Sequence, residues 1–128
     1  MLEGVHVALM RCLDRLTGKP AARRSPLWPA CRAGHLRRQP RCAACATTQH
    51  LAVHHIQPFH IRPELELADG LGAQECNLVT LCESPAHNCH LIWGHCLSWS
   101  SWNPEVVADA ATFLRKVEAR PQWVAGGE

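Results

Sequence analysis

The chain contains no tyrosine and only two phenylalanines among its 128 residues. Five tryptophans and the leucines must therefore supply the large side chains of the interior. Trp93, Trp99 and Trp102 are expected in the core, and platforms on which nucleobases stack are the less favoured interpretation. A length of this order fits one compact domain plus a tail. Because a domain with a modest core is often reinforced by disulfides or by a structural metal, the eight cysteines are the first feature to explain.

The marks of a secreted or membrane protein are also missing. The first 16 residues interrupt their apolar side chains with Glu3, Arg11, Asp14 and Arg15, which is not the pattern of a secretory signal. No apolar run reaches the roughly 18 residues that can span a bilayer. These absences predict a cytoplasmic protein, in which cysteines hold metal more often than they pair with each other.

Acidic residues are scarce in the first third of the chain. Residues 1–41 hold nine Arg or Lys against two acids, whereas residues 42–128 hold four against nine. Such a basic segment is typical of proteins that bind a polyanion, although a solvated helix face would look the same. The side chains expected to contact phosphates, and so to position the protein without reading bases, are Arg23, Arg24, Arg37, Arg38 and Arg41.

The pattern of apolar residues predicts an α+β chain. Helical spacing appears in residues 2–16 and 27–38, while residues 51–56 and 77–82 are short and β-rich. A helix bearing the segment CHLIWGH should follow the second strand. The last helix is the best marked, because Asn103 suits an N-cap, Pro104 suits the first helical position and Pro121 ends the pattern.

Two cysteine pairs predict a structural zinc site. Cys42 and Cys45 form a C-x2-C pair, and Cys82 and Cys89 follow about forty residues later. Four thiolates suit the tetrahedral coordination of zinc. The second pair has the wider spacing C-x6-C, so His87 inside it is an alternative ligand to Cys89. A thiol redox motif is the weaker interpretation, because it does not explain the neighbouring histidines.

Histidine is abundant, and its distribution is informative. Of nine histidines, His54, His55 and His60 fall in one place, and His90 and His95 fall in another. Adjacent residues of a strand point to opposite faces, so His54 and His55 should not serve one metal shell together. One of them can bind a metal ion. The other can act as a general base, which accepts a proton from a water molecule that attacks a substrate.

Taken in order, the segments CAAC, LAVHHIQPF, NLVTLC and NCHLIWGH resemble the HNH endonuclease family with its cysteine zinc site. More narrowly, RSPLWPACRAGHLRRQPRCAAC, PFHIRPELEL and GHCLSWSSWNPEVVADA resemble a bacterial and phage subgroup of small stand-alone HNH proteins. The likeness covers about residues 23–118. It implies a bacterial protein, or a phage protein in the host cytoplasm.

The resemblance implies a ββα-metal fold, in which two strands and a helix hold one divalent ion against the scissile phosphate. Matched to the family motif, His54 is the first metal ligand, His55 the general base, Asn77 the residue that orients this base, and His90 the second ligand. His95 matches a further ligand of some members, although five residue steps separate it from His90 where four are usual. Many members carry aspartate in place of His54. An imidazole there favours Mn²⁺, Ni²⁺ or Zn²⁺ over Mg²⁺.

The expected organisation is an N-terminal helix and linker in residues 1–22, an HNH nuclease domain in residues 23–118 and a tail in residues 119–128. The domain should hydrolyse phosphodiester bonds of DNA, most readily double-stranded, and leave 5′-phosphate and 3′-hydroxyl ends. A zinc-containing module that binds nucleic acid without cutting it is the alternative. The combination of His54, His55, Asn77 and His90 favours the enzyme, because binding alone does not require it.

Overall fold

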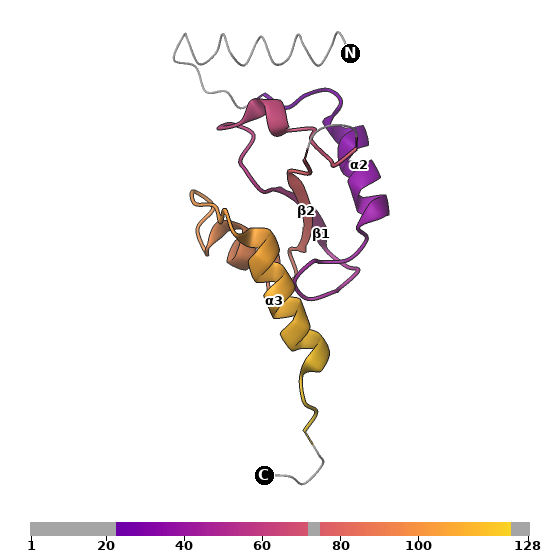
Figure 1. Cartoon of the computed structure of the whole chain (residues 1–128), viewed down its shortest axis with the longest axis vertical. Helices are drawn as coiled ribbons and strands as arrows, with labels where there is room; N and C mark the ends of the chain where they lie inside the picture. The colour runs from indigo at the N-terminus through magenta and orange to yellow at the C-terminus, as the bar shows by residue number, and fades with distance from the viewer. Residues whose placement is uncertain (1–22, 72–74, 124–128) are drawn as a thin grey trace.

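The computed structural model of the chain describes residues 23–71 and 75–123. Its elements follow in the order α2 (Trp28–Arg38), β1 (Leu51–His55), the 3-10 helix η1 (Pro63–Leu65), β2 (Leu78–Cys82), the π-helix η2 (His90–Gly94) and α3 (Val106–Ala119) (Figure 1). The expected α+β class is therefore confirmed. The helix expected in residues 2–16 lies outside the described residues. No helix within the described ranges has the length and apolar character needed to cross a bilayer.

Helix α2 agrees closely with the segment predicted from the sequence. A proline stands in its first turn, and His35, Arg37 and Arg38 occupy its last turn, where positive charge complements the helix dipole. The helix ends at Arg38, and Gln39 takes φ −127° and ψ 75°. That backbone follows from Pro40, since proline disfavours a helical conformation in the residue before it.

The two strands form one antiparallel pair at the centre of the molecule. Leu51 pairs with Cys82 and His55 pairs with Leu78, and every residue of β2 is buried. A pair of strands needs further packing to be stable. In Figure 1, α2 lies to the right of this pair, and η2 with the upper end of α3 lies to the left. Leu81, Val106 and Ala110 are fully buried at the centre of this packing.

Helix α3 begins at Val106, later than the predicted N-cap at Asn103. The Asn103 side chain does accept a hydrogen bond from the backbone N–H of Glu105, 2.9 Å away. Its amide also donates to the carbonyl of Trp93 (2.9 Å) and to the carboxylate of Asp109 (2.8 Å). Asn103 therefore joins α3 to η2, and the residues between it and Val106 form a turn instead of the first helical turn.

The predicted helix around CHLIWGH is a π-helix of five residues. Its hydrogen bonds span one residue more than those of an α-helix. Such turns are rare in proteins, and those that occur are often found at functional sites. Beyond it, Cys96 (φ 52°) and Leu97 (φ 69°) adopt left-handed backbone conformations. The Leu97 N–H donates to the carbonyl of Leu91 at 2.9 Å, which closes the end of η2.

Candidate metal centres and their cavity

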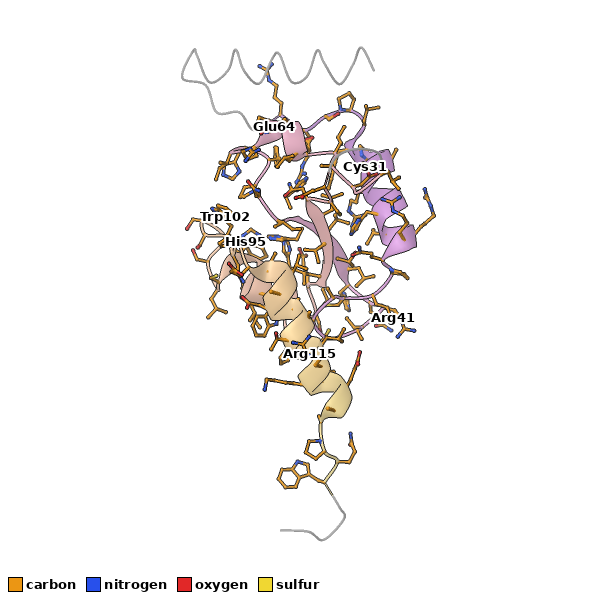
Figure 2. The ribbon with its side chains drawn as sticks, viewed as in Figure 1. Cys31, Arg41, Glu64, His95, Trp102 and Arg115 are labelled. Atoms are coloured by element: carbon orange, nitrogen blue, oxygen red, sulfur yellow. The ribbon has the colours of Figure 1, made fainter. Side chains whose placement is uncertain are left out.

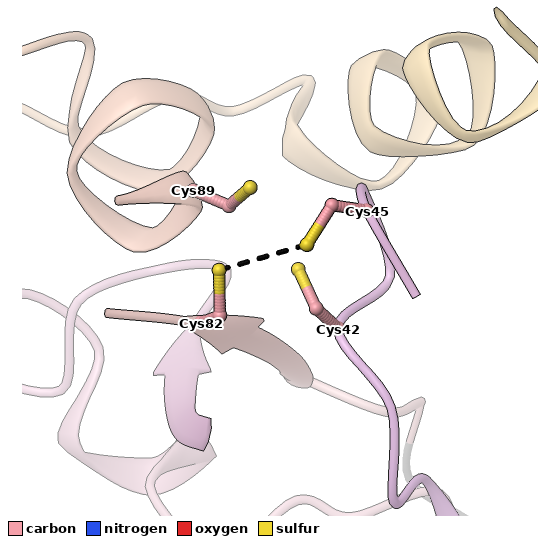
Figure 3. A group of neighbouring side chains, drawn as sticks. All are labelled: Cys42, Cys45, Cys82 and Cys89. Carbon is pink, nitrogen blue, oxygen red and sulfur yellow. Dashed lines mark hydrogen bonds between the residues drawn. The ribbon is translucent and has the colours of Figure 1, made fainter. Parts of the chain in front are cut away.

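The first candidate centre consists of the four predicted cysteines, drawn in Figure 3. Cys42 and Cys45 come from the turn after α2, Cys82 from the end of β2, and Cys89 from the residue before η2. The four sulfur atoms all lie within 4.8 Å of one another, and Cys45 Sγ is 3.7 Å from Cys82 Sγ. Sulfur atoms about 2.3 Å from a tetrahedral zinc are about 3.8 Å apart, so these residues fit the ion.

Protonation within this cluster also favours a metal. The Cys89 thiol donates a hydrogen bond to Cys42, and this bond is the main reason that the pKa of Cys42 falls to about 4. Burial raises the pKa of Cys45 to about 11. A buried thiolate with three further sulfur atoms around it is the donor set of a structural zinc. His87, the alternative ligand, is exposed, whereas Cys89 is buried within the cluster.

None of the seven described cysteines forms a disulfide. The 3.7 Å between Cys45 Sγ and Cys82 Sγ also far exceeds the roughly 2.05 Å of a sulfur–sulfur bond. The four cysteines are therefore available together as metal ligands.

The second candidate centre is formed by His54 of β1 and by His90 and His95 at the two ends of η2. His90 Nε2 lies 3.1 Å from His54 Nδ1 and 3.2 Å from His95 Nε2, and one ligand atom of each ring lies within 4.8 Å of the others. The π-helix explains why five residue steps suffice. Its i to i+5 hydrogen bonds widen the turn, and the His90 and His95 rings then lie on one side, where an α-helix would favour a spacing of four residues.

Two outer hydrogen bonds orient these rings. Glu83 Oε1 lies 2.9 Å from His90 Nδ1, and the carbonyl oxygen of Ser101 lies 2.7 Å from His95 Nδ1. Each Nδ1–H donates outward, so each Nε2 turns its lone pair toward the cluster. Histidine ligands of metals commonly have such a carboxylate or carbonyl partner. Sequence reasoning missed Glu83, whose only local signal is its position directly after Cys82.

Protonation does not explain the close approach of the three histidine rings. Burial, and then the proximity of His90 and His95, lowers the pKa of His54 to about 3. Burial likewise lowers the pKa of His90. Both shifts disfavour a proton on His54 and His90, and nitrogen lone pairs that converge without a proton repel unless a cation lies between them. Three imidazole nitrogens on a partly buried surface suit a divalent transition ion.

His55 has different surroundings from its neighbour His54, as strand alternation predicted. Its ring packs against Trp28 and Phe59, with centroids 4.7 Å and 5.6 Å away. Its Nε2 lies 3.0 Å from the carbonyl oxygen of Glu66. A carbonyl only accepts, so Nε2 carries the proton in the neutral ring, and Nδ1 is the nitrogen that can act as a base.

Asn77 acts on the loop that leads to Glu66. Its side-chain oxygen accepts from the Gln57 N–H at 2.8 Å, and its amide donates to the carbonyls of Gln57 (3.0 Å) and Leu65 (3.3 Å). Both ends of the loop are thereby fixed next to the carbonyl that contacts His55. Any orienting effect of Asn77 through these bonds reaches His55 by way of this backbone.

Glu66 is a second residue that sequence reasoning missed. Its side chain is only 1% exposed, and its carboxylate accepts from the Ser25 N–H at 2.7 Å. The same residue thus holds His55 through its carbonyl and the segment next to Arg24 through its carboxylate. Ser25 and Glu66 are 41 positions apart, so no local pattern announces the pair.

The three clustered histidines and His55 line one cavity of about 530 Å³. Its wall includes His54, His55, His90 and His95, together with Arg24, Phe59, Trp99 and Trp102. The Arg24 guanidinium lies over the rings of Trp28 (4.8 Å) and Phe59 (4.4 Å). A cationic group, a possible metal site and a possible base therefore face the same space.

The other four predicted phosphate-binding arginines do not line this cavity. Arg23, Arg37, Arg38 and Arg41 are exposed, and Arg38 pairs with Asp69 at 3.3 Å. Figure 2 shows Arg41 to the right of the strand pair, whereas His95 lies to its left. The basic residues are thus spread over more than one face.

The expectation that three tryptophans belong to the core is wrong for Trp99. Trp93 does pack on the core and against Phe113, with ring centroids 5.1 Å apart, and Trp102 is half-buried at the cavity. Trp99 is 56% exposed. The hydrophobic character of a tryptophan does not reveal which side of a loop carries it.

Comparisons of this chain with family models, with curated proteins and with solved structures find no match. The likeness to HNH endonucleases therefore rests on the motifs quoted above, and the function has to be argued from the geometry of the two clusters and the cavity.

Proposed function

We propose that the chain is a metal-dependent HNH endonuclease with a structural zinc and a separate catalytic ion. The observation that carries the proposal is the convergence of His54, His90 and His95, with nitrogen contacts of 3.1 and 3.2 Å, in the same cavity as His55. A module that only binds DNA has no use for three converging imidazoles beside a further histidine whose Nε2 is held by a backbone carbonyl.

In this proposal, His54, His90 and His95 hold the catalytic ion, and the four cysteines hold the zinc. A divalent ion bound there would stabilise negative charge on the phosphate and on the departing 3′ oxygen. The donor set contains nitrogen only, so it favours Mn²⁺, Ni²⁺ or Zn²⁺ over Mg²⁺, which prefers oxygen.

His55 would take a proton from the attacking water through Nδ1, because Nε2 donates to the Glu66 carbonyl. In the neutral ring, Nδ1 then carries the lone pair that accepts the proton. Arg24, which lines the cavity, would bind a phosphate of the strand. The products would carry 5′-phosphate and 3′-hydroxyl ends, since water attacks phosphorus and the 3′ oxygen departs.

Plasmid cleavage with Mg²⁺, Mn²⁺, Ni²⁺ and Zn²⁺ tests the proposal directly. His55→Ala should slow single-turnover cleavage by about 100- to 10,000-fold, with zinc content and DNA affinity near those of the parent, because a general base acts mainly in the transition state. His90→Ala should regain part of its activity at a higher ion concentration. His87→Ala, a change at an exposed histidine outside both clusters, is the matched control.

The decisive comparison is between His55→Ala and His87→Ala. If both cut at the parent rate, His55 is not the base, and the module that binds DNA without cutting becomes the better account. If neither the parent nor the variants cut with any of the four ions, the nuclease assignment is wrong.

A further inference from the structure

Trp99 exposes a large aromatic surface next to the proposed catalytic ion. Its ring centroid lies 5.1 Å from that of His90 and 4.8 Å from that of His95. More than half of the residue remains exposed, 56%, and it lines the cavity. Singly exposed apolar residues are common on protein surfaces, but this indole also lines the cavity, so a ligand bound there would cover it.

The loop that carries Trp99 is held in place by the site itself. Cys96 and Leu97 have φ values of 52° and 69°, which residues other than glycine rarely adopt unless their surroundings enforce it. The Ser98 N–H donates to the carbonyl of His95 at 3.0 Å, and the Ser101 N–H donates to that of Ser98 at 2.9 Å. The Ser101 carbonyl in turn accepts from His95. The indole is thus placed by the same residues that place a proposed metal ligand.

The cavity is larger than a phosphate and a water require. Its volume of about 530 Å³ lies within the range of sites for small organic ligands, about 300–1,000 Å³. Phe59, Trp99 and Trp102 supply aromatic wall, and Arg24 supplies positive charge. Aromatic surface beside a cation is the combination that binds a single strand of nucleic acid, since bases stack on the rings and phosphates follow the charge.

Building on the proposed nuclease function, we infer that Trp99 is a stacking platform for an unpaired nucleobase adjacent to the scissile phosphate. The substrate class is then DNA whose base can leave the helix: a single strand, or a duplex opened by a mismatch or gap. A base within an intact duplex has both faces covered and must first be unstacked, which costs energy. Cleavage of an intact duplex should therefore be slower than cleavage of the same sequence as a single strand.

The inference is tested by measuring how the full chain binds a series of oligonucleotides. Each oligonucleotide carries one abasic residue, and its position differs along the strand from one oligonucleotide to the next. The measurement uses the His55→Ala background with Mn²⁺, so that cleavage does not interfere. One abasic position beside the cut site should weaken binding about 5- to 150-fold, the value of one stacked base. Trp99→Ala should remove this dependence, Trp99→Phe should keep most of it, and Trp123→Ala is the matched control, being 89% exposed and outside the cavity.

Intrinsic fluorescence provides a second measurement that does not need the alanine variant to fold. A single-stranded oligonucleotide should quench the parent more strongly than Trp99→Phe, because a stacked base quenches the indole that it covers. Equal quenching of the two proteins, together with abasic positions that all bind alike, would overturn the inference.

Failure of the inference can be separated from failure of the proposed function. A parent that cuts DNA but shows no abasic effect and no preference for single strands would retain the nuclease and lose the stacking site. A parent that cuts no DNA, yet loses affinity at one abasic position in a manner that depends on Trp99, would retain the stacking site and lose the nuclease.

Discussion

Replacing Gly94 by alanine should loosen the proposed catalytic ion while leaving the fold intact. Gly94 is buried at the end of η2, where a Cβ would lie 3.0 Å from Nδ1 and Cε1 of His54 and 3.2 Å from Cδ2 of His90. Nonbonded carbon atoms in favourable contact are about 3.5–4.0 Å apart. The His54 ring must therefore move by a few tenths of an ångström, together with the nitrogen proposed to hold the ion.

The expected size of the effect follows from the tolerance of metal coordination. Ligand distances usually fall within about 0.2 Å of their ideal values, so a displacement of a few tenths of an ångström should matter. We expect a loss of affinity like that caused by removing an outer partner of a metal ligand, about 10- to 100-fold, or roughly 1.4–2.7 kcal/mol. Alanine itself is favoured over glycine within helices by about 0.5–1 kcal/mol, so unfolding should change little.

The assay is a titration of the zinc-loaded protein with Ni²⁺ in a calorimeter, with zinc content checked before and after. Gly34→Ala is the matched control, because a Cβ at Gly34 would meet only the mobile ends of Arg38 (3.4 Å) and Arg37 (3.6 Å). The control should be slightly more stable and bind Ni²⁺ as the parent does. Parent-like Ni²⁺ affinity in Gly94→Ala would refute the view that this close packing positions His54 as a ligand.

Three further predictions concern the zinc site, the buried carboxylate and the basic residues. Cys82→Ala should lose the bound zinc and stable folding, because structural zinc supplies much of a small domain's stability; a folded, zinc-free variant by circular dichroism and metal analysis would contradict this. Glu66→Ala should lower the free energy of unfolding, measured in urea, by about 1–3 kcal/mol, since the Ser25 N–H loses its acceptor. Glu66→Gln retains an acceptor oxygen and should lose less stability. Equal stability of Glu66→Ala and the parent would disprove the role of this bond. Arg24→Gln should weaken DNA binding and reduce its salt slope by about one, because Arg24 lines the cavity proposed to hold the substrate, and Arg38→Gln should do so less because Arg38 lies outside it. Equal slopes for the two variants in salt-titrated binding would count against this difference.

Local patterns in the sequence were sufficient for much of the fold. Helix α2 and strands β1 and β2 lie within a residue or two of their predicted positions, because the spacing of apolar residues and the position of Pro40 act over only a few residues. The four cysteines could also be chosen in advance, since the C-x2-C spacing and two later cysteines leave few ways to complete a tetrahedral site. Strand alternation predicted that His54 and His55 have different partners, and the structure gives them different partners.

Other features depend on contacts between distant parts of the chain. The proximity of His95 to His54 and His90 follows from the π-helical turn of η2, and an α-helical reading of the same residues argues against it. The periodicity of the sequence does not predict a π-helical turn, because the additional residue in that turn is accommodated by packing against β1 and β2.

The sequence by itself determined which residue types were available for the two candidate metal centres and on which strands and turns they stand. Tertiary structure alone decided that Glu83 and Ser101 orient the histidine rings, that Glu66 fixes His55, and that Trp99 faces the cavity. Each of these contacts depends on how segments approach one another, and that is set by the packing of α2, η2 and α3 around one pair of strands.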